Sequence, residues 1–521
     1  MTSRAYPERA RSRLPPDVLA AFAAAVLLSA AFIAIASSHL DTLMWEYDEG
    51  PFMLGARSIS RGLRPFVDFA VHQPPLHLYL LALSGKVFGA TLFGYRMLSV
   101  MSVALSGFLL FCLVRPFAGP LPGLFAQAVF LFSPSQMHAL NAVGEPPMLL
   151  FTLLGVAFLF LGRGRPSAYL SGVAFVAALL IKPTCLLMVL AAALSLVYAR
   201  AWRRLGDFAV AGVIAGAVGL AWLFVMSDGI FTDILRYTAR RVGARTAGLW
   251  DIDSGFPELR RLLGIETHGQ WTLFCFRIFW LYPVRHLPMG LFFVAFLGIP
   301  VWVFRCARGA PALRAFAVLW PASYVLTNFI ALDYVSSKYF VPFLAFTAFL
   351  LAGLVWLAER YVPPLAVAAA GVVMCGALMT QLASSLGRQI DPWYYGRADW
   401  ITHEYPRLVS FSPIFFAATG TEPGCGLSNP PDTYGAFGEA ILGGTERLQR
   451  FKVSEAQLIE CLRAHPETRV VIDFWYYFFT RPGSALRGYL RGEGSEQPLF
   501  FSPEALAQWD QPRITIGAVS R

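Results

Sequence analysis

Eleven apolar segments, most of them joined by short polar connections, constrain the fold of this chain more than any other feature. A helix needs about 20 apolar residues to cross a bilayer. The segments fall at 18–36, 98–114, 121–140, 147–161, 168–181, 184–198, 208–226, 287–304, 316–332, 339–357 and 364–382. Only 14% of the residues are charged, against about 25% in soluble domains. The sequence therefore predicts a polytopic α-helical membrane protein.

The arginines of the short connections predict its orientation. The first apolar segment has no small-residue cleavage pattern, so it is interpreted as a retained span that follows a cytoplasmic N-terminus. Ten arginines then fall on the cytoplasmic side: Arg115, Arg163, Arg165, Arg200, Arg203, Arg204, Arg305, Arg308, Arg314 and Arg360. The short outer connections carry few basic residues, namely Lys86, Arg96, Lys182 and Lys338. This asymmetry is typical of the positive-inside rule.

The first outer loop, 37–96, contains a short apolar stretch at 76–88 that includes His77 and Lys86. If this stretch crossed the membrane, the arginine clusters would lie outside. We therefore expect a helix that lies on the outer interface, with a second interfacial helix at 50–62. A second large outer loop is predicted at 227–285.

Two adjacent carboxylates, Asp48 and Glu49, stand in the first outer loop just where the chain leaves the membrane. Acidic side chains at a membrane boundary are costly unless they have a partner or a role. The pair is therefore a candidate functional site. The alternative is a pair of solvated loop acids.

Further polar residues are predicted on the same outer face: His72, Gln73, Glu145, Lys182, Arg240, Arg241, Arg245, Lys338 and Tyr339. A carboxylate can deprotonate an acceptor hydroxyl as a general base, and cations can hold a leaving phosphate. Each residue also has a plainer interpretation. The lysines can be snorkelling anchors, the arginines a solvated or lipid-facing surface, the histidines interfacial polar groups, and Glu145 the start of a helix.

The composition changes after residue 383, where charged residues, glycine and proline become more frequent. A helix at 453–464, with Ser454 and Gln457 in capping-box spacing, and a strand at 469–474 predict a small α/β domain at 384–521. An odd number of spans places this domain outside the cytoplasm. Cys425 and Cys461 are its only cysteines, so a disulfide between them is one possibility. The spacing of the seven cysteines does not indicate a metal cluster.

Several motifs of the outer face occur in an order that resembles one family. They are Asp48-Glu49-Gly-Pro-Phe-Met-Leu-Gly-Ala56-Arg57, Gly62-Leu-Arg-Pro65, Gln73-Pro74-Pro75-Leu76, Ile181-Lys182-Pro183-Thr184 and Lys338-Tyr339-Phe-Val-Pro342. Over about residues 15–385 the chain resembles the GT-C superfamily of membrane glycosyltransferases, in particular its protein-mannosyltransferase and aminoarabinose-transferase branch.

The resemblance implies that Asp48 is the catalytic base and that Glu49, Lys182, Lys338 and Tyr339 line the donor and acceptor cavity. It also implies a polyprenyl-phosphate sugar as donor, with a glycan, lipid or protein as acceptor, at the outer face of a bacterial inner membrane. Gln73 stands where aminoarabinose transferases have a lysine, so the phosphate-binding cation must come from Lys182, Lys338 or the arginines of the second outer loop. The resemblance does not decide whether the reaction uses a divalent metal, and the sequence assigns no metal ligand.

Two other functions are compatible with the sequence. A transporter or flippase of lipid-linked sugars would show broken helices and polar residues at the membrane midplane, often in repeated halves. A non-catalytic scaffold would use the bundle only to present the C-terminal domain. We predict a GT-C-type catalytic module at 1–383 and expect membrane lipids, but not nucleic acid, among its partners.

Overall fold

The computed structural model describes residues 16–41, 49–69, 71, 73–227, 291–331, 341–388, 392–411, 415–416, 424–426, 455–473, 476, 484–501 and 509.

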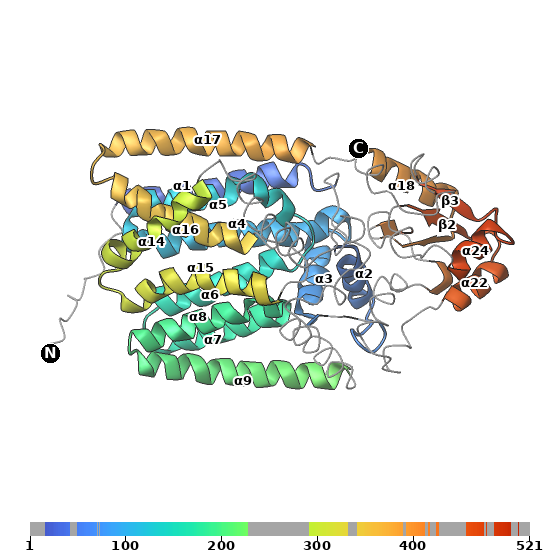
Figure 1. Ribbon diagram of the computed structural model, residues 1–521, viewed down its shortest axis with the longest axis horizontal. Coiled ribbons are helices and arrows are strands. Elements are labelled where there is room, and N and C mark those ends of the chain that lie inside the picture. The colour runs from blue at the N-terminus through green and yellow to red at the C-terminus, as the bar shows by residue number, and fades with distance from the viewer. Residues whose placement is uncertain are drawn as a thin grey trace, which may run out of the picture.

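A bundle of helices forms the larger part of the molecule, and the helices lie roughly side by side along its long axis (Figure 1). The connections α8–α9, η4–α15 and α16–α17 lie at the end opposite to the C-terminal domain. The bundle helices are α1 (Pro16–Ser37), α4 (Leu92–Ala118), α5 (Pro120–Phe132), α6 (Glu145–Leu161), α7 (Gly164–Ile181), α8 (Leu186–Tyr198), α9 (Trp202–Ser227), α13 (Leu291–Phe296), α14 (Gly298–Val301), the π-helical turn η4 (Trp302–Cys306), α15 (Pro311–Ala331), α16 (Val341–Ala358) and α17 (Pro364–Arg388).

The described part of each predicted span overlaps one of these helices. Among the described residues, six helices are long and apolar enough to cross a membrane: α1, α4, α7, α9, α16 and α17. The predicted fold class, a polytopic helical membrane protein, is therefore confirmed. The number of crossings stays a prediction, because α5, α6 and α8 have only 13, 17 and 13 residues.

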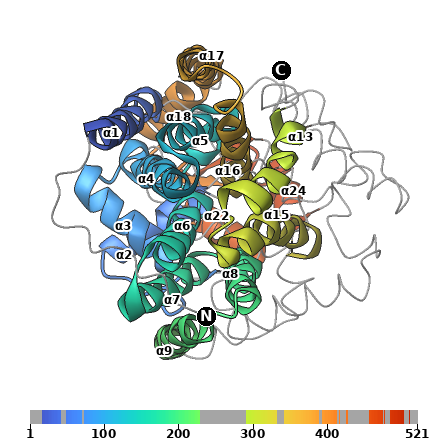
Figure 2. The same ribbon diagram turned by 90° about the vertical axis from the view of Figure 1, so that its left-hand side faces the viewer.

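Helix α16 lies at the centre of the bundle, and its residues from Val341 to Gly353 are all buried. Trp302 stacks on Phe349 with ring centroids 4.0 Å apart, and its indole N–H donates to the Phe349 carbonyl at 2.8 Å. A Cβ at Gly298 would lie 2.1 Å from the Leu350 carbonyl oxygen, so glycine permits α14 to approach α16. Small residues at helix contacts are typical of membrane bundles. Helices α1, α9 and α17 lie at the periphery (Figure 2) and expose many large apolar side chains.

Two short helices, α2 (Glu49–Ser60) and α3 (Leu76–Phe88), lie between the end of the bundle and the C-terminal domain (Figure 1). They correspond to the interfacial helices predicted at 50–62 and 76–88. The turn between them contains Gly62, with φ of +88°, and the fully buried Phe66, with φ of +67°. Positive φ is uncommon for a residue such as phenylalanine, and the Phe66 N–H bonds the Phe69 carbonyl at 2.9 Å.

The C-terminal domain contains a three-stranded parallel sheet of order β1-β2-β3. Its elements are α18 (Pro392–Glu404), β1 (Leu408–Ser410), the 3₁₀ turn η6 (Gly424–Gly426), α22 (Glu455–Ala464), β2 (Arg469–Ile472), α24 (Ala485–Arg491) and β3 (Pro498–Phe500). The helix α22 and the strand β2 correspond to the helix predicted at 453–464 and the strand predicted at 469–474. Ser454, the first residue of the predicted capping box, lies outside the described residues. The predicted boundary at 383/384 falls in the last turn of α17.

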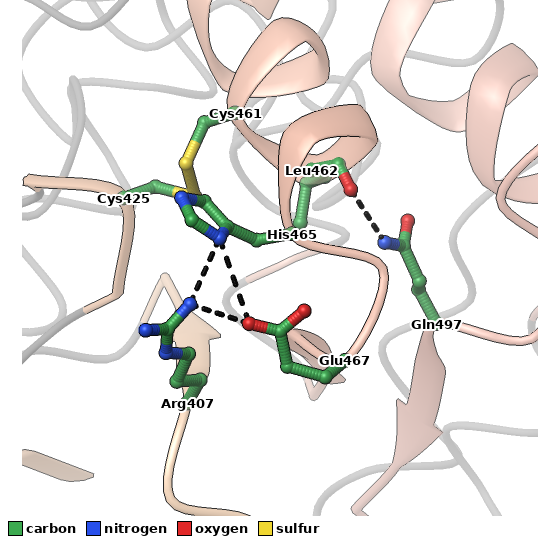
Figure 3. The surroundings of a disulfide bond; sticks show 7 residues. All are labelled: Arg407, Cys425, Cys461, Leu462, His465, Glu467 and Gln497. Carbon is green, nitrogen blue, oxygen red and sulfur yellow. Dashed lines mark hydrogen bonds and ion pairs between the residues drawn. A yellow bond between two sulfur atoms is a disulfide. The ribbon is translucent and has the colours of Figure 1, made fainter.

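A disulfide joins Cys425 of η6 to Cys461 of α22 (Figure 3). Beside it, Arg407 bonds His465 and forms an ion pair with Glu467, while the Gln497 amide donates to the Leu462 carbonyl at 2.9 Å. The disulfide that the sequence left open is therefore formed.

Candidate functional site

A buried ion pair ties the start of α2 to α4. The Arg96 guanidinium donates through Nη2 to Glu49 Oε1 at 2.5 Å and through Nε to Glu49 Oε2 at 3.0 Å. Both side chains are 0% exposed. Arg96 also donates to the Leu40 carbonyl just after α1. A two-pronged arginine–carboxylate contact fixes geometry as well as charge, so this pair sets where α2 begins.

The same carboxylate holds the connection before α6. The Ala142 N–H donates to Glu49 Oε2 at 3.0 Å. The Ser99 hydroxyl donates to the Asn141 carbonyl at 2.6 Å, and His77 Nε2 lies 3.3 Å from the Ala142 carbonyl. Both oxygens of Glu49 are therefore bonded to protein groups, which suits a residue that fixes the neighbouring loops rather than one that touches substrate.

A second buried ion pair lies three residues further along this connection. Lys182 Nζ lies 2.5 Å from Glu145 Oε1, and the two side chains are 7% and 2% exposed. Glu145 is the first residue of α6, where Pro146 and Pro147 follow at positions whose N–H groups have no helical partner. Lys182 directly follows α7 with an extended backbone, because Pro183 disfavours a helical conformation at the preceding residue.

The surroundings of Lys182 decide whether its ammonium is a snorkelling anchor in water or a buried charged group. A snorkelling lysine extends its ammonium into water, whereas Lys182 is buried beside Glu145. Among the described residues, Glu145 Oε2 has no hydrogen-bond partner. The second oxygen of this carboxylate is therefore not used in holding Lys182.

His77 lies on α3 next to both ion pairs, and its ring contacts Phe52 edge-on at 4.9 Å. Burial lowers the pKa of His77 from 6.5 to about 4, while the bond to Ala142 and the charge of Glu145 act in the opposite direction. His77 is thus neutral at pH 7 and serves as a hydrogen-bonding spacer between α3 and the 140–144 connection.

This gives a prediction for pH dependence. Between pH 6.5 and about 4 the unfolded chain binds a proton at residue 77 that the folded chain does not. Between pH 7.5 and pH 5.0 the free energy of unfolding of the wild type is expected to fall by about 2 kcal/mol more than that of His77→Gln. Thermal unfolding in detergent at both pH values measures the difference. If both proteins lose the same amount of stability, His77 is not held neutral in the folded state.

Many of the predicted site residues lie outside the described residues. They are Asp48, His72, Arg240, Arg241, Arg245, Lys338 and Tyr339. Gln73 is described and half-buried just before α3. Glu145 and Lys182 form an ion pair, and Glu49 bonds Ala142, three residues before Glu145. The predicted roles of all these residues remain predictions.

Sequence reasoning missed Arg96 as the partner of Glu49, although it named Arg96 among the outer basic residues. In the structure Arg96 lies inside the apolar helix α4, where an arginine needs an acidic or carbonyl partner, but the sequence does not indicate which group that partner is. Within the described ranges no three His, Cys, Asp or Glu side chains lie together in a way that could hold a metal ion.

Comparison with known proteins bears on the fold of the chain. Residues 72–227 match the family model for dolichyl-phosphate-mannose-protein mannosyltransferase. The fold is similar to ArnT from Cupriavidus metallidurans bound to undecaprenyl phosphate, with a TM-score of 0.50, 16% identity, and coverage of 76% of this chain and 85% of that chain. The apo form of that protein gives a TM-score of 0.51 at 16% identity, covering 78% and 86%.

The oligosaccharyltransferase of Archaeoglobus fulgidus, in complex with zinc and sulfate, is similar with a TM-score of 0.50 and 13% identity. The alignment covers 77% of this chain and 62% of that one. A search of curated protein sequences found no match. The resemblance is thus confirmed at the level of the fold: residues 72–227 match the mannosyltransferase family model, and the chain has the fold of the GT-C membrane glycosyltransferases.

Proposed function

We propose that this protein transfers a sugar from a polyprenyl-phosphate-linked donor to a glycan, lipid or protein acceptor outside the cytoplasm. The observation that carries the proposal is the buried Glu145–Lys182 pair. Glu145 follows, by three residues, Ala142, whose N–H donates to Glu49 of the acidic motif. Buried charges cost free energy unless they are paired, and they mark functional sites in membrane proteins.

In the proposed reaction Asp48 removes the proton of the acceptor hydroxyl, and the donor phosphate leaves as an anion. The ammonium of Lys182 neutralises this leaving group, while Glu145 holds the ammonium in place. Such a preorganised cation favours the transition state because the negative charge on the phosphate grows as the bond to the sugar breaks. Glu49 and Arg96 take no part in proton transfer, and they keep the start of α2 in position.

Two independent features support an extracytoplasmic site. The Cys425–Cys461 disulfide is typical of an oxidising compartment outside the cytoplasm, and the C-terminal domain that contains it lies at the same end of the bundle as α2 and α3 (Figure 1). At the opposite end, Arg204 donates to the Phe158 and Gly162 carbonyls, within the arginine-rich connections. The positive-inside rule favours the cytoplasm for that end.

Lys182 provides the test of the proposed phosphate site. With synthetic polyprenyl-phosphate sugars, Lys182→Met is expected to lower kcat/KM by about a hundredfold, because the leaving phosphate loses its buried counter-charge. Lys182→Arg should retain part of the activity, since it keeps the positive charge. Radiolabelled sugar transfer by the purified proteins measures the effect.

The control is Lys86→Met, which removes an exposed lysine from α3 and should leave turnover unchanged. Wild-type turnover by Lys182→Met would refute the phosphate role. If the purified wild-type protein transfers no sugar from any polyprenyl-phosphate donor, the proposed function itself is wrong.

A further inference from the structure

The C-terminal domain contacts the helix that begins beside the acidic motif. The Arg57 guanidinium on α2 donates through Nη2 to the Phe416 carbonyl at 3.2 Å, and 359 residues separate the two in sequence. This bond is therefore a direct link between α2 and the C-terminal domain.

The link lies at the edge of a continuous apolar core. One buried cluster includes Phe52 and Leu54 of α2 and Leu81 of α3 together with residues of the C-terminal domain. The members from that domain are Ala398, Ile401, Leu408, Phe415, Phe416, Val471 and Phe501. Domains of one chain move relative to each other unless their interface is large and apolar. The shared core indicates a docked domain rather than a tethered one.

Phe415 and Phe416 are themselves firmly placed. They are 0% and 2% exposed, their rings meet edge-on at 5.7 Å, and Phe415 meets Phe501 at 6.3 Å. The chain returns to β1 at Gly424, where a Cβ would lie 2.7 Å from the Leu408 carbonyl oxygen. The next residue, Cys425, is fixed to α22 by the disulfide. The described residues on either side of Phe416 are thus held by the protein: Ser410 lies in β1, and Cys425 forms the disulfide.

Helix α2 is consequently held from two sides. Arg96 holds its first residue, Glu49, against α4, and Phe416 holds Arg57, two turns later, against the C-terminal domain. Gly55 between them brings α2 close to α3, because a Cβ there would lie 3.2 Å from Leu78. A displacement of α2 would also displace Asp48, because Asp48 immediately precedes α2 in the chain.

We propose that the C-terminal domain positions the catalytic loop through the contact of Arg57 with Phe416, and that Arg57 is a positioning residue for the transfer reaction. The proposal rests on the proposed function only in naming Asp48 as the group that is positioned. The docking of α2 can be measured without any substrate.

The first experiment compares Arg57→Met with Arg57→Lys in the full-length protein. Arg57→Met removes the donor, so hydrogen exchange of the amides of α2 is expected to be about tenfold faster while α4 to α7 are unchanged. The kcat for sugar transfer should fall roughly ten- to a hundredfold with little change in donor KM, because a displaced base slows the chemical step but not binding. Arg57→Lys keeps a hydrogen-bond donor, so it should retain part of the exchange protection of α2 and part of kcat.

The matched control is Arg463→Met. Arg463 lies on α22 and forms an exposed ion pair with Glu493 inside the C-terminal domain. Its removal should change neither the exchange of α2 nor kcat. If Arg463→Met and Arg57→Met behave alike, the effect comes from the loss of an arginine in general and the proposal is overturned.

The second experiment removes the disulfide with Cys425→Ser combined with Cys461→Ser. The exchange of α2 should again rise, because the segment with Phe416 loses its fixed end. Unchanged exchange of α2 in both Arg57→Met and the double serine variant would overturn the proposal. Faster exchange together with a wild-type protein that transfers no sugar would refute the proposed function but retain the docking. Wild-type kcat in Arg57→Met, with an active wild type, would refute the positioning role alone.

Discussion

Replacement of Asp48 by asparagine is expected to lower sugar transfer by about 10²–10⁴-fold, the usual contribution of a general base. Asparagine has nearly the same size but cannot accept the proton of the acceptor hydroxyl. The KM for the polyprenyl-phosphate donor should change little, because the substitution leaves the phosphate contacts in place. Transfer of radiolabelled sugar by the purified proteins measures both constants.

The control for this prediction is Asp41→Asn. Asp41 is an exposed acid that follows α1 and precedes Asp48 in the same loop of the sequence, so its loss removes one negative charge from that loop without removing the proposed base. The Asp41→Asn variant should transfer sugar at the wild-type rate. If Asp48→Asn turns over as fast as Asp41→Asn, Asp48 is not the base.

Removal of Arg96 is expected to have the largest effect on stability. Arg96→Met leaves the Glu49 carboxylate buried without its counter-charge, and breaking one side of a buried pair typically costs about 3–5 kcal/mol. The protein should unfold at a lower temperature, and α2 should lose protection against hydrogen exchange because Glu49 also holds Ala142. Thermal unfolding in detergent and exchange measurements test this.

The double variant Glu49→Gln with Arg96→Met separates loss of the pair from loss of an arginine. Glutamine is uncharged but can still accept the Ala142 N–H, so the double variant should be more stable than Arg96→Met alone. Arg463→Met, which breaks the exposed pair with Glu493, should melt close to the wild type because exposed pairs contribute little. A double variant that is no more stable than Arg96→Met would contradict an electrostatic role for the pair.

Local properties of the sequence determined much of the fold. The length and apolarity of each run predict a helix wherever it occurs, and α3 has the predicted bounds of 76–88. The helix at Glu455–Ala464 and the strand at Arg469–Ile472 follow from equally local patterns. The resemblance of the acidic motif and the Lys-Pro turn to one family also lies in short stretches of residues, and the fold agrees with it.

The partners of the charged residues required the tertiary structure. Glu49 pairs with Arg96 across 47 residues, and Glu145 pairs with Lys182 across 37. Nothing local distinguishes these partners from the other outer cations, since helix packing alone decides which side chains meet. The disulfide was one possibility in the sequence and became definite only when η6 and α22 were brought together.

The sequence by itself thus determined a helical membrane protein with acids and cations on one face and an α/β domain at its C-terminus. The tertiary structure decided which acid pairs with which cation, and it joined α2 to the C-terminal domain through Arg57 and Phe416. The physical reason is the range of the interactions. Hydrophobic length and helix-ending prolines act within a few residues. Buried ion pairs and domain contacts instead depend on groups far apart in the sequence, which only the packed molecule brings to 3.2 Å or less of each other.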